Sequence, residues 1–340
     1  MSVVLPEIEY WRHDLSSCLQ DCLATLLIQR GHDPVPALGA AWDFYYPPGD
    51  FRPEEYYYPC RWDGLAESVL PYHPVTSRWR TPPGPGAAWA EVRAEVEAGR
   101  PAIVAVDNYH LPFRPAYGDV HTNHLVIVYG FDDDASVAHV IDSKPPRFRG
   151  SVRMDDLSAA RGSANPAHHD RDLFYTQRPI EGRWLEVRVG GDFPELTPEW
   201  VRTVVERNVE RFLDREGDGA FSGLTGLRDY LADVADRAGE ADGPRVMDEL
   251  YVVGWAAQQC AGLHADFLAA AGRRLGRPRL AELGRDVDRL AHHWSDLRML
   301  GAHCRAEPAA AAGRIRARTV QLVSDTQRAL ARMEGAVACG

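Results

Sequence analysis

The sequence predicts an α+β fold in which an antiparallel sheet with helices is followed by a region built of helices alone. Short apolar runs bounded by turn residues, typical of strands, lie before Pro194, and helical periodicity continues from there to the end. At 340 residues the chain is also longer than one hydrophobic core usually fills. We therefore expect two domains, over residues 1–192 and 193–340.

The first predicted helix begins with a cysteine. Ser17 and Gln20 have the spacing of a capping box, and Gly31 suits the end of the helix. Cys18 then takes the first helical position, where unpaired backbone N–H groups and the helix dipole favour a thiolate. Cys22 falls on an apolar stripe shared with several leucines, so we interpret Cys22 as a core residue and Cys18 as the candidate nucleophile.

The segment of residues 32–85 is rich in proline, glycine and aromatic residues, and the one regular element expected in it is a short helix at 64–70. Its aromatic side chains, which include Trp42, Tyr45 and Tyr57, have two interpretations. They line a substrate pocket, or they fill the core in place of regular elements. The pattern does not choose between these two.

A predicted helix over residues 87–98 leads into a buried strand over 102–106. This strand delivers Asp107 to the edge of the sheet, and Tyr109 and His121 follow in a loop. Polar side chains that emerge together at a strand end are candidates for a binding site.

A predicted strand begins at His124, a turn follows over residues 131–135, and a second predicted strand returns after the turn. Pairing Gly130 with Ser136 across this turn places His124 opposite Asp142. Opposed side chains are close enough for a carboxylate to orient an imidazole, whereas a slip of one residue would turn them to opposite faces. The two strands are expected over residues 124–130 and 136–142.

The remaining elements are predicted from proline and glycine residues that end helices and strands, and from hydrophobic periodicity. The run Lys144-Pro145-Pro146 is expected to end the sheet, and residues 150–183 look irregular except for a helix at 155–161. One more strand is predicted at 184–189. Helices are predicted over residues 198–214, 221–240, 244–275, 279–307 and 309–338.

Composition excludes several classes of function. The net charge of −11 argues against a nucleic-acid-binding protein, which normally presents a basic surface. The six cysteines lack the CxxC spacing of a zinc site, and no metal is expected. The sequence shows neither a signal segment nor an apolar run of membrane-spanning length, so we expect a cytoplasmic protein without a membrane partner.

Cys18, His124 and Asp142 together have the residue types of a thiol acyl-transfer site. In such a site the cysteine attacks an acyl carbonyl, the histidine holds or shuttles its proton, and the carboxylate fixes the histidine tautomer. The backbone N–H of Cys18 at the helix start is the natural donor to the oxyanion.

These segments resemble a known family. Residues 18–31 are similar to the opening of the N-terminal domain of the butirosin biosynthesis protein H family, a relative of the C39-type papain-like cysteine peptidases. The strand that ends at Asp107, with Leu111-Pro112-Phe113 after it, and the strands that begin at His124 and end at Asp142 resemble family segments in the same order. One departure is Ser17, because the family commonly has histidine directly before its cysteine.

The resemblance implies a papain-like, C39-type catalytic domain followed by an α-helical domain. It implies an enzyme of antibiotic biosynthesis that forms an amide, moving an acyl or aminoacyl group from an acyl carrier protein thioester to an amine of a small-molecule intermediate. Cys18 would be acylated, His124 would act as base and acid, and Asp142 would orient it. The chain would need no cofactor of its own, because the carrier protein holds the phosphopantetheine.

The same reading implies contacts with the acceptor and leaves two other functions open. The side chains expected to bind substrate are Asp107, Tyr109, His121, Trp42, Tyr45 and Tyr57. The first alternative function is hydrolysis of a thioester or peptide by the same three catalytic residues. The second is an inactive binding module. A homodimer is also left open.

Overall fold

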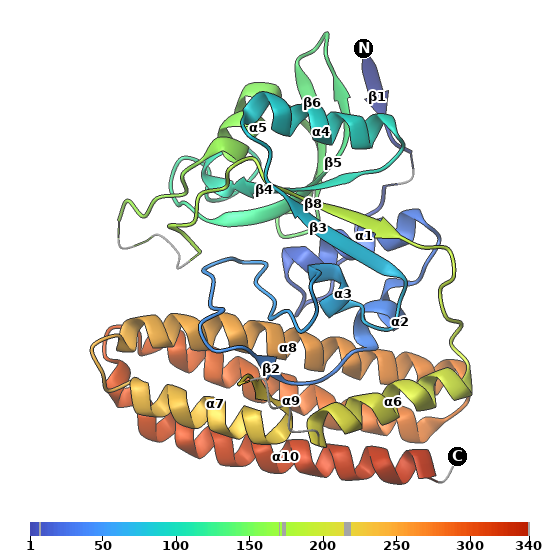
Figure 1. Cartoon of the computed structure of the whole chain (residues 1–340), viewed down its shortest axis with the longest axis vertical. Coiled ribbons are helices and arrows are strands. Elements are labelled where there is room, and N and C mark those ends of the chain that lie inside the picture. Colours follow the sequence, from blue (N-terminus) through green and yellow to red (C-terminus); the bar gives the residue numbers. More distant parts are fainter. Residues whose placement is uncertain (7, 170, 172–174, 214–218, 339–340) are drawn as a thin grey trace.

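The computed structural model describes residues 1–6, 8–169, 171, 175–213 and 219–338, and it has the predicted α+β fold. An antiparallel sheet with helices packed on it comes first in the chain. A layer of long helices follows, and in Figure 1 this layer lies below the sheet.

The main sheet is antiparallel throughout, and the described residues contribute seven strands to it. The predicted strands are present, but the expectation that Lys144-Pro145-Pro146 ends the sheet is wrong, because the chain returns after these residues and pairs along the preceding strand. From one edge to the other the strands are β3 (Val75–Arg80), β8 (Trp184–Val189), β4 (Ala102–Asp107), β5 (Asn123–Asp132), β6 (Val137–Asp142) and β7 (Phe148–Arg153), while β1 (Ser2–Val4) pairs with the end of β5.

The helix that starts with the cysteine is α1 (Cys18–Gln29), and Gly31 follows it with a φ of +79°. A single apolar stripe was expected, but residues Cys18 to Leu27 are all buried. The strands and the helical part enclose this helix, so even Gln20 and Asp21 are buried. The other helices of the first part are α2 (Pro34–Gly39), α3 (Leu65–Val69), α4 (Pro85–Glu97) and α5 (Met154–Gly162).

The helical part agrees closely with the predicted periodicity. Its helices are α6 (Pro198–Leu213), α7 (Gly223–Arg237), α8 (Gly243–Arg274), α9 (Pro278–His303) and α10 (Ala312–Ala338). Neither Gly254 nor Gly262 interrupts α8. Gly262 allows a close approach, because a Cβ atom at this position would lie 2.5 Å from Cδ1 of Leu15.

The aromatic segment joins the two parts of the molecule. Strand β2 (Tyr45–Tyr46) pairs with β9 (Phe221–Ser222) from the helical part. Trp42, Phe44 and Tyr46 belong to the hydrophobic cluster that α6 to α10 build, which is separate from the cluster under the sheet. These aromatic residues therefore fill a core, which is one of the two roles the sequence left open.

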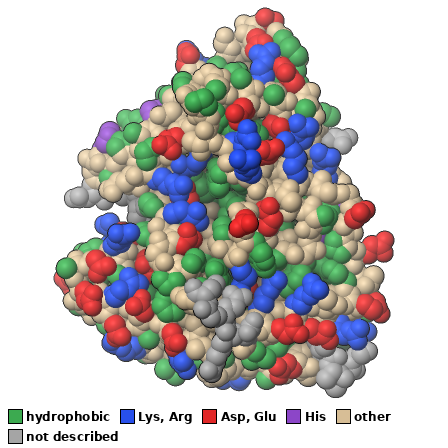
Figure 2. All heavy atoms as spheres, viewed as in Figure 1, with side chains coloured by type: hydrophobic (Ala, Val, Ile, Leu, Met, Phe, Trp, Pro, Cys, Tyr) green, Lys and Arg blue, Asp and Glu red, His purple; other side chains and the backbone are tan. Residues whose placement is uncertain are grey.

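On the face shown in Figure 2, acidic and basic side chains are interspersed over the surface. Among the described residues, every helix is too short or too polar to span a lipid bilayer.

Candidate active site

The capping box at the start of α1 is present and fixes the position of Cys18. The Ser17 hydroxyl accepts a hydrogen bond from the N–H of Leu19 (3.3 Å), and Gln20 Oε1 accepts one from the N–H of Ser17 (3.0 Å). Cys18 is therefore the first helical residue. Its side chain is buried, with 1% of the residue exposed, and the N–H of Leu125 in β5 donates a hydrogen bond to its sulfur.

His124 and Asp142 meet through a register that differs from the predicted one. Near the turn Gly130 pairs with His139, three residues beyond the predicted partner. An irregularity between Val128 and Gly130 then reduces the shift to two, since Val128 pairs with Val140. A shift of two residues returns a side chain to the same face of a sheet. His124 Nε2 consequently lies 3.0 Å from Asp142 Oδ2.

Asp142 is held by two further donors. Arg114 Nη1 donates to Oδ2 (2.9 Å), and the N–H of Lys144 donates to Oδ1 (2.9 Å). Burial alone would raise the pKa of the Asp142 carboxyl, but His124 and Arg114 outweigh it and hold the pKa below its ordinary value. Asp142 is thus a carboxylate at neutral pH.

Glu55 is a member of the site that the sequence analysis missed. Its Oε2 lies 2.7 Å from His124 Nδ1, the ring nitrogen opposite the one that faces Asp142. A carboxylate oxygen of Glu55, a ring nitrogen of His124 and the sulfur of Cys18 all lie within 4.8 Å of one another. Glu55 comes from the irregular aromatic segment, where no periodicity or motif marks it.

The resting charge state follows from these contacts. Burial would lower the pKa of His124, but Asp142 and Glu55 raise it well above 6.5, so the imidazole is protonated. Burial raises the pKa of the Cys18 thiol, the Glu55 carboxylate raises it further, and the opposing effect of His124 is smaller. The expectation of a thiolate stabilised by the helix start is therefore wrong for the resting site, because desolvation outweighs the helix dipole.

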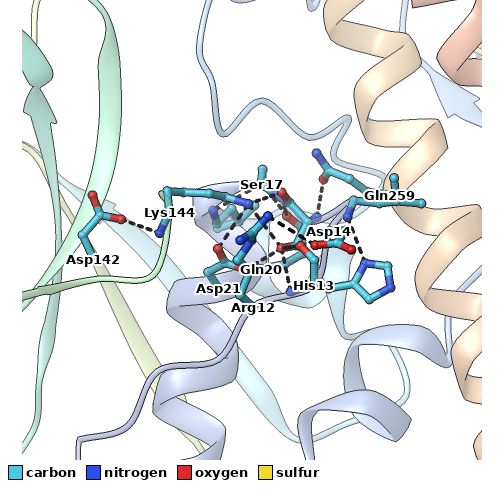
Figure 3. A network of polar contacts seen from close by, with 12 residues as sticks. Arg12, His13, Asp14, Ser17, Gln20, Asp21, Asp142, Lys144 and Gln259 are labelled. Atoms are coloured by element: carbon cyan, nitrogen blue, oxygen red, sulfur yellow. Dashed lines mark hydrogen bonds and ion pairs between the residues drawn. The ribbon is translucent and has the colours of Figure 1, made fainter. Parts of the chain in front are cut away.

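A polar network connects this site with both parts of the molecule. Lys144, which follows β6, reaches the start of α1, where its Nζ lies 3.2 Å from Asp21 Oδ2 and contacts the backbone oxygen of Ser16. On the same helix Gln20 Nε2 donates to Oε1 of Gln259 in α8 (2.6 Å). Figure 3 shows these contacts side by side. They fix the start of α1 relative to the end of β6, and hence Cys18 relative to Asp142.

Asp107, Tyr109 and His121 form a separate cluster. Asp107 is fully buried, and its oxygens accept hydrogen bonds from Ser163 Oγ (2.6 Å) and from the N–H groups of Tyr109 and Thr122. The ring of His121 stacks on Tyr109 and contacts Asp107 through Nδ1 (2.6 Å). This arrangement organises the loop after β4, and it argues against the predicted contact of Asp107 with substrate.

The three predicted aromatic residues also lie elsewhere. Trp42 packs against Phe212 and His264 in the helical core, and the Tyr57 hydroxyl donates to Asp50 (3.3 Å). Tyr45 lies in β2, and the guanidinium carbon of Arg61 lies 4.5 Å from the centre of the Tyr45 ring.

A different tyrosine lies close to the site. The backbone oxygen of Tyr175 accepts a hydrogen bond from the N–H of Asn123, the residue before His124 (3.2 Å), and burial raises the pKa of the Tyr175 hydroxyl. Its ring meets Trp255 of α8 edge to face at 6.2 Å between ring centres. The helical part therefore packs against a residue that is hydrogen-bonded to the start of β5.

The residue types of Cys18, Glu55 and His124 also match those that bind zinc. Around a tetrahedral zinc ion, nitrogen and oxygen ligands would lie roughly 3.3 Å apart, from the bond lengths of about 2.0–2.2 Å. The observed 2.7 Å between His124 Nδ1 and Glu55 Oε2 is the separation of a charged hydrogen bond. The arrangement fits a proton-transfer group better than a metal site.

The family comparison covers the residues of this site. A family model described as butirosin biosynthesis protein H, N-terminal, matches residues 17–143. The match begins one residue before Cys18, ends one residue after Asp142, and includes Glu55 and His124. It confirms the resemblance stated from the sequence, and residues 17–143 carry this N-terminal domain. A search of the curated proteins found no match.

Proposed function

We propose that this chain is a cysteine-dependent acyltransferase that forms an amide in the biosynthesis of a natural product. The donor is an acyl or aminoacyl thioester on the phosphopantetheine arm of an acyl carrier protein, and the acceptor is an amine of a small molecule. The observation that carries the proposal is the buried group of Cys18, His124 and Glu55, which lies within the family match and is backed by Asp142. Residues 1–192 form the catalytic domain in this proposal.

The roles of the residues follow from their contacts. Cys18 gives its proton to the pair formed by Glu55 and His124 and attacks the thioester carbonyl. His124 returns a proton to the sulfur of the departing carrier, so the pair ends the step with the proton count it had at the start. Asp142 keeps the imidazole oriented through Nε2. The N–H of Cys18 at the helix start stabilises the oxyanion.

Two physical arguments support transfer over hydrolysis. Exchange of one thioester for another is nearly balanced in free energy, and an amine then forms a more stable amide. In addition, Cys18 and His124 are almost completely buried, with 1% and 0% of each residue exposed. A buried acyl-enzyme limits the access of water, which is the competing nucleophile.

The test is intact-protein mass spectrometry after incubation with a panel of acyl thioesters of N-acetylcysteamine. We expect an adduct with the mass of the acyl group in the wild-type protein and in Cys22→Ala, and none in Cys18→Ala. Cys22 is a matched control, because it lies one turn further along the same helix and is also buried.

The products separate the alternatives. Adding an amine should discharge the adduct as an amide. Discharge as a free acid at the same rate with and without amine would indicate a hydrolase. Failure of every donor to form an adduct would contradict the proposed acyl-enzyme and favour a binding module.

A further inference from the structure

The position of Glu55 is built into the fold. The N–H of Glu55 donates to Asn123 Oδ1 (2.9 Å), and Asn123 Nδ2 donates to the backbone oxygen of Pro53 (3.0 Å). The preceding residue, Glu54, is buried and forms ion pairs with Arg183 (3.0 Å), which is also buried, and with the half-buried Arg178 (2.7 Å). Contacts on both sides therefore hold the Glu55 carboxylate against His124.

Glu55 is also the most exposed charged group in contact with His124. Its side chain is 14% exposed, whereas those of His124 and Asp142 are 0% and 1% exposed. Asp142 covers Nε2 of the imidazole, and Glu55, which has an oxygen within 4.8 Å of the Cys18 sulfur, covers Nδ1. The outer edge of the site is thus a carboxylate.

We propose that Glu55 binds the acceptor as an ammonium ion and so selects amines over water for attack on the acylated Cys18. This inference rests on the proposed acyltransfer. Amines are protonated near neutral pH, and a carboxylate beside the acyl group attracts a cation while offering a neutral water no such interaction. Glu55 thereby determines the class of nucleophile.

The chemistry balances as follows. The nitrogen–carbon bond of the amide forms and the sulfur–carbon bond to Cys18 breaks. The ammonium loses two protons, because it must become an amine before attack and a neutral amide afterwards. One proton is taken by Glu55 and released to water, and the other reaches the sulfur of Cys18 through His124.

The experiment compares Glu55→Gln with the wild-type protein, using 1,4-diaminobutane as a cationic nucleophile and hydroxylamine, which is neutral near pH 7. A hydrogen bond to a charged group is worth enough for a loss of about tenfold or more. Because Glu55 also takes part in proton transfer from Cys18, Glu55→Gln should slow the acylation step to the same extent with both nucleophiles. We expect an additional loss with the diamine alone, seen as a KM that rises by about that factor and as more hydrolysis of the acyl-enzyme, while KM for hydroxylamine stays unchanged. Glu55→Asp should restore part of the preference.

Two controls make the result decisive. Glu97→Gln removes an exposed carboxylate that pairs with Arg93 on α4, and it should change neither reaction. Calorimetric titration of the unacylated protein with 1,4-diaminobutane should show binding that Glu55→Gln weakens, whatever the fate of the acyl-enzyme.

An equal change in KM for both nucleophiles, or no change in either, would overturn the inference and leave Glu55 with its proton-transfer role alone. Diamine binding that is absent, or unchanged in Glu55→Gln, would also overturn it. By contrast, the lack of any acyl adduct alongside normal diamine binding would refute the acyltransfer and retain the ammonium site.

Discussion

Asp142→Asn should destabilise the protein by about 3 kcal/mol, near the lower end of the cost of breaking a buried ion pair. Asp142 accepts hydrogen bonds from His124, Arg114 and the N–H of Lys144. Asparagine keeps the shape, but either orientation of its amide places an NH₂ group against at least one of these donors. It also removes the negative charge between a buried imidazolium and a guanidinium that is only 11% exposed.

The assay is urea unfolding followed by tryptophan fluorescence at pH 6, with Asp155→Asn as a control. Asp155 pairs with Arg153, but both side chains are largely exposed, so the control should match the wild-type protein. A double-mutant cycle with Arg114→Gln should show that the two losses are not additive, because the residues are in contact. A loss below about 1 kcal/mol for Asp142→Asn would refute the reasoning, because it is the size of a surface pair.

The pH dependence of this loss has a defined sign. The folded pKa of Asp142 is below 3.8, so its stabilising charge is fully present above that value and is lost as the pH falls through the folded pKa. The folded pKa of His124 is well above 6.5, so its contribution is complete below 6.5 and is lost as the pH rises through the folded pKa. The stability difference between Asp142→Asn and wild type should therefore narrow at both extremes.

Three other outcomes are expected. Alkylation of Cys18 by iodoacetamide should be slow at pH 7 and accelerate above pH 9, because burial raises the thiol pKa. Glu55→Gln should speed the alkylation at pH 7, since the Glu55 carboxylate also raises this pKa. Rapid alkylation of the wild-type protein at pH 7 would contradict the raised pKa. Gly39→Ala should lower the free energy of unfolding by about 1–3 kcal/mol, because the added Cβ would lie 2.2 Å from the backbone oxygen of Leu263. An unchanged midpoint of thermal unfolding would show that α2 shifts to make room for the methyl group. Ser17→Ala should lower the free energy of unfolding by about 1 kcal/mol, because the helix loses its N-terminal cap. An unchanged free energy in urea unfolding would show that the cap is dispensable.

The sequence by itself determined the features that depend on neighbours along the chain. The capping box placed Cys18 at the first position of its helix, and the 3.6-residue periodicity located the five long helices of the second part. The buried strand that ends at Asp107 was equally clear. In each case the sequence pattern that predicts the element lies within a short segment of the chain. Local hydrogen bonding and local burial therefore decide the structure that forms.

Strand pairing was determined only in part. The sequence predicted a hairpin that brings His124 to Asp142, and the two side chains do meet. The predicted pairing was nevertheless wrong, because β5 continues to Asp132 and the turn comes later than expected, which shifts the pairing by three residues before the irregularity between Val128 and Gly130 reduces the shift to two. Strands β3 and β7 were missed because their sequences are largely polar and they are stabilised mainly by pairing with β8 and β6.

Tertiary structure alone decided which side chains surround the nucleophile. Glu55 reaches His124 across 69 positions of sequence, held by Asn123, and nothing in its own segment indicates this contact. Trp42 lies instead in the helical core. The protonation state of Cys18 differed from the prediction for the same reason, because burial and a neighbouring carboxylate act through space and outweigh the local effect of the helix start.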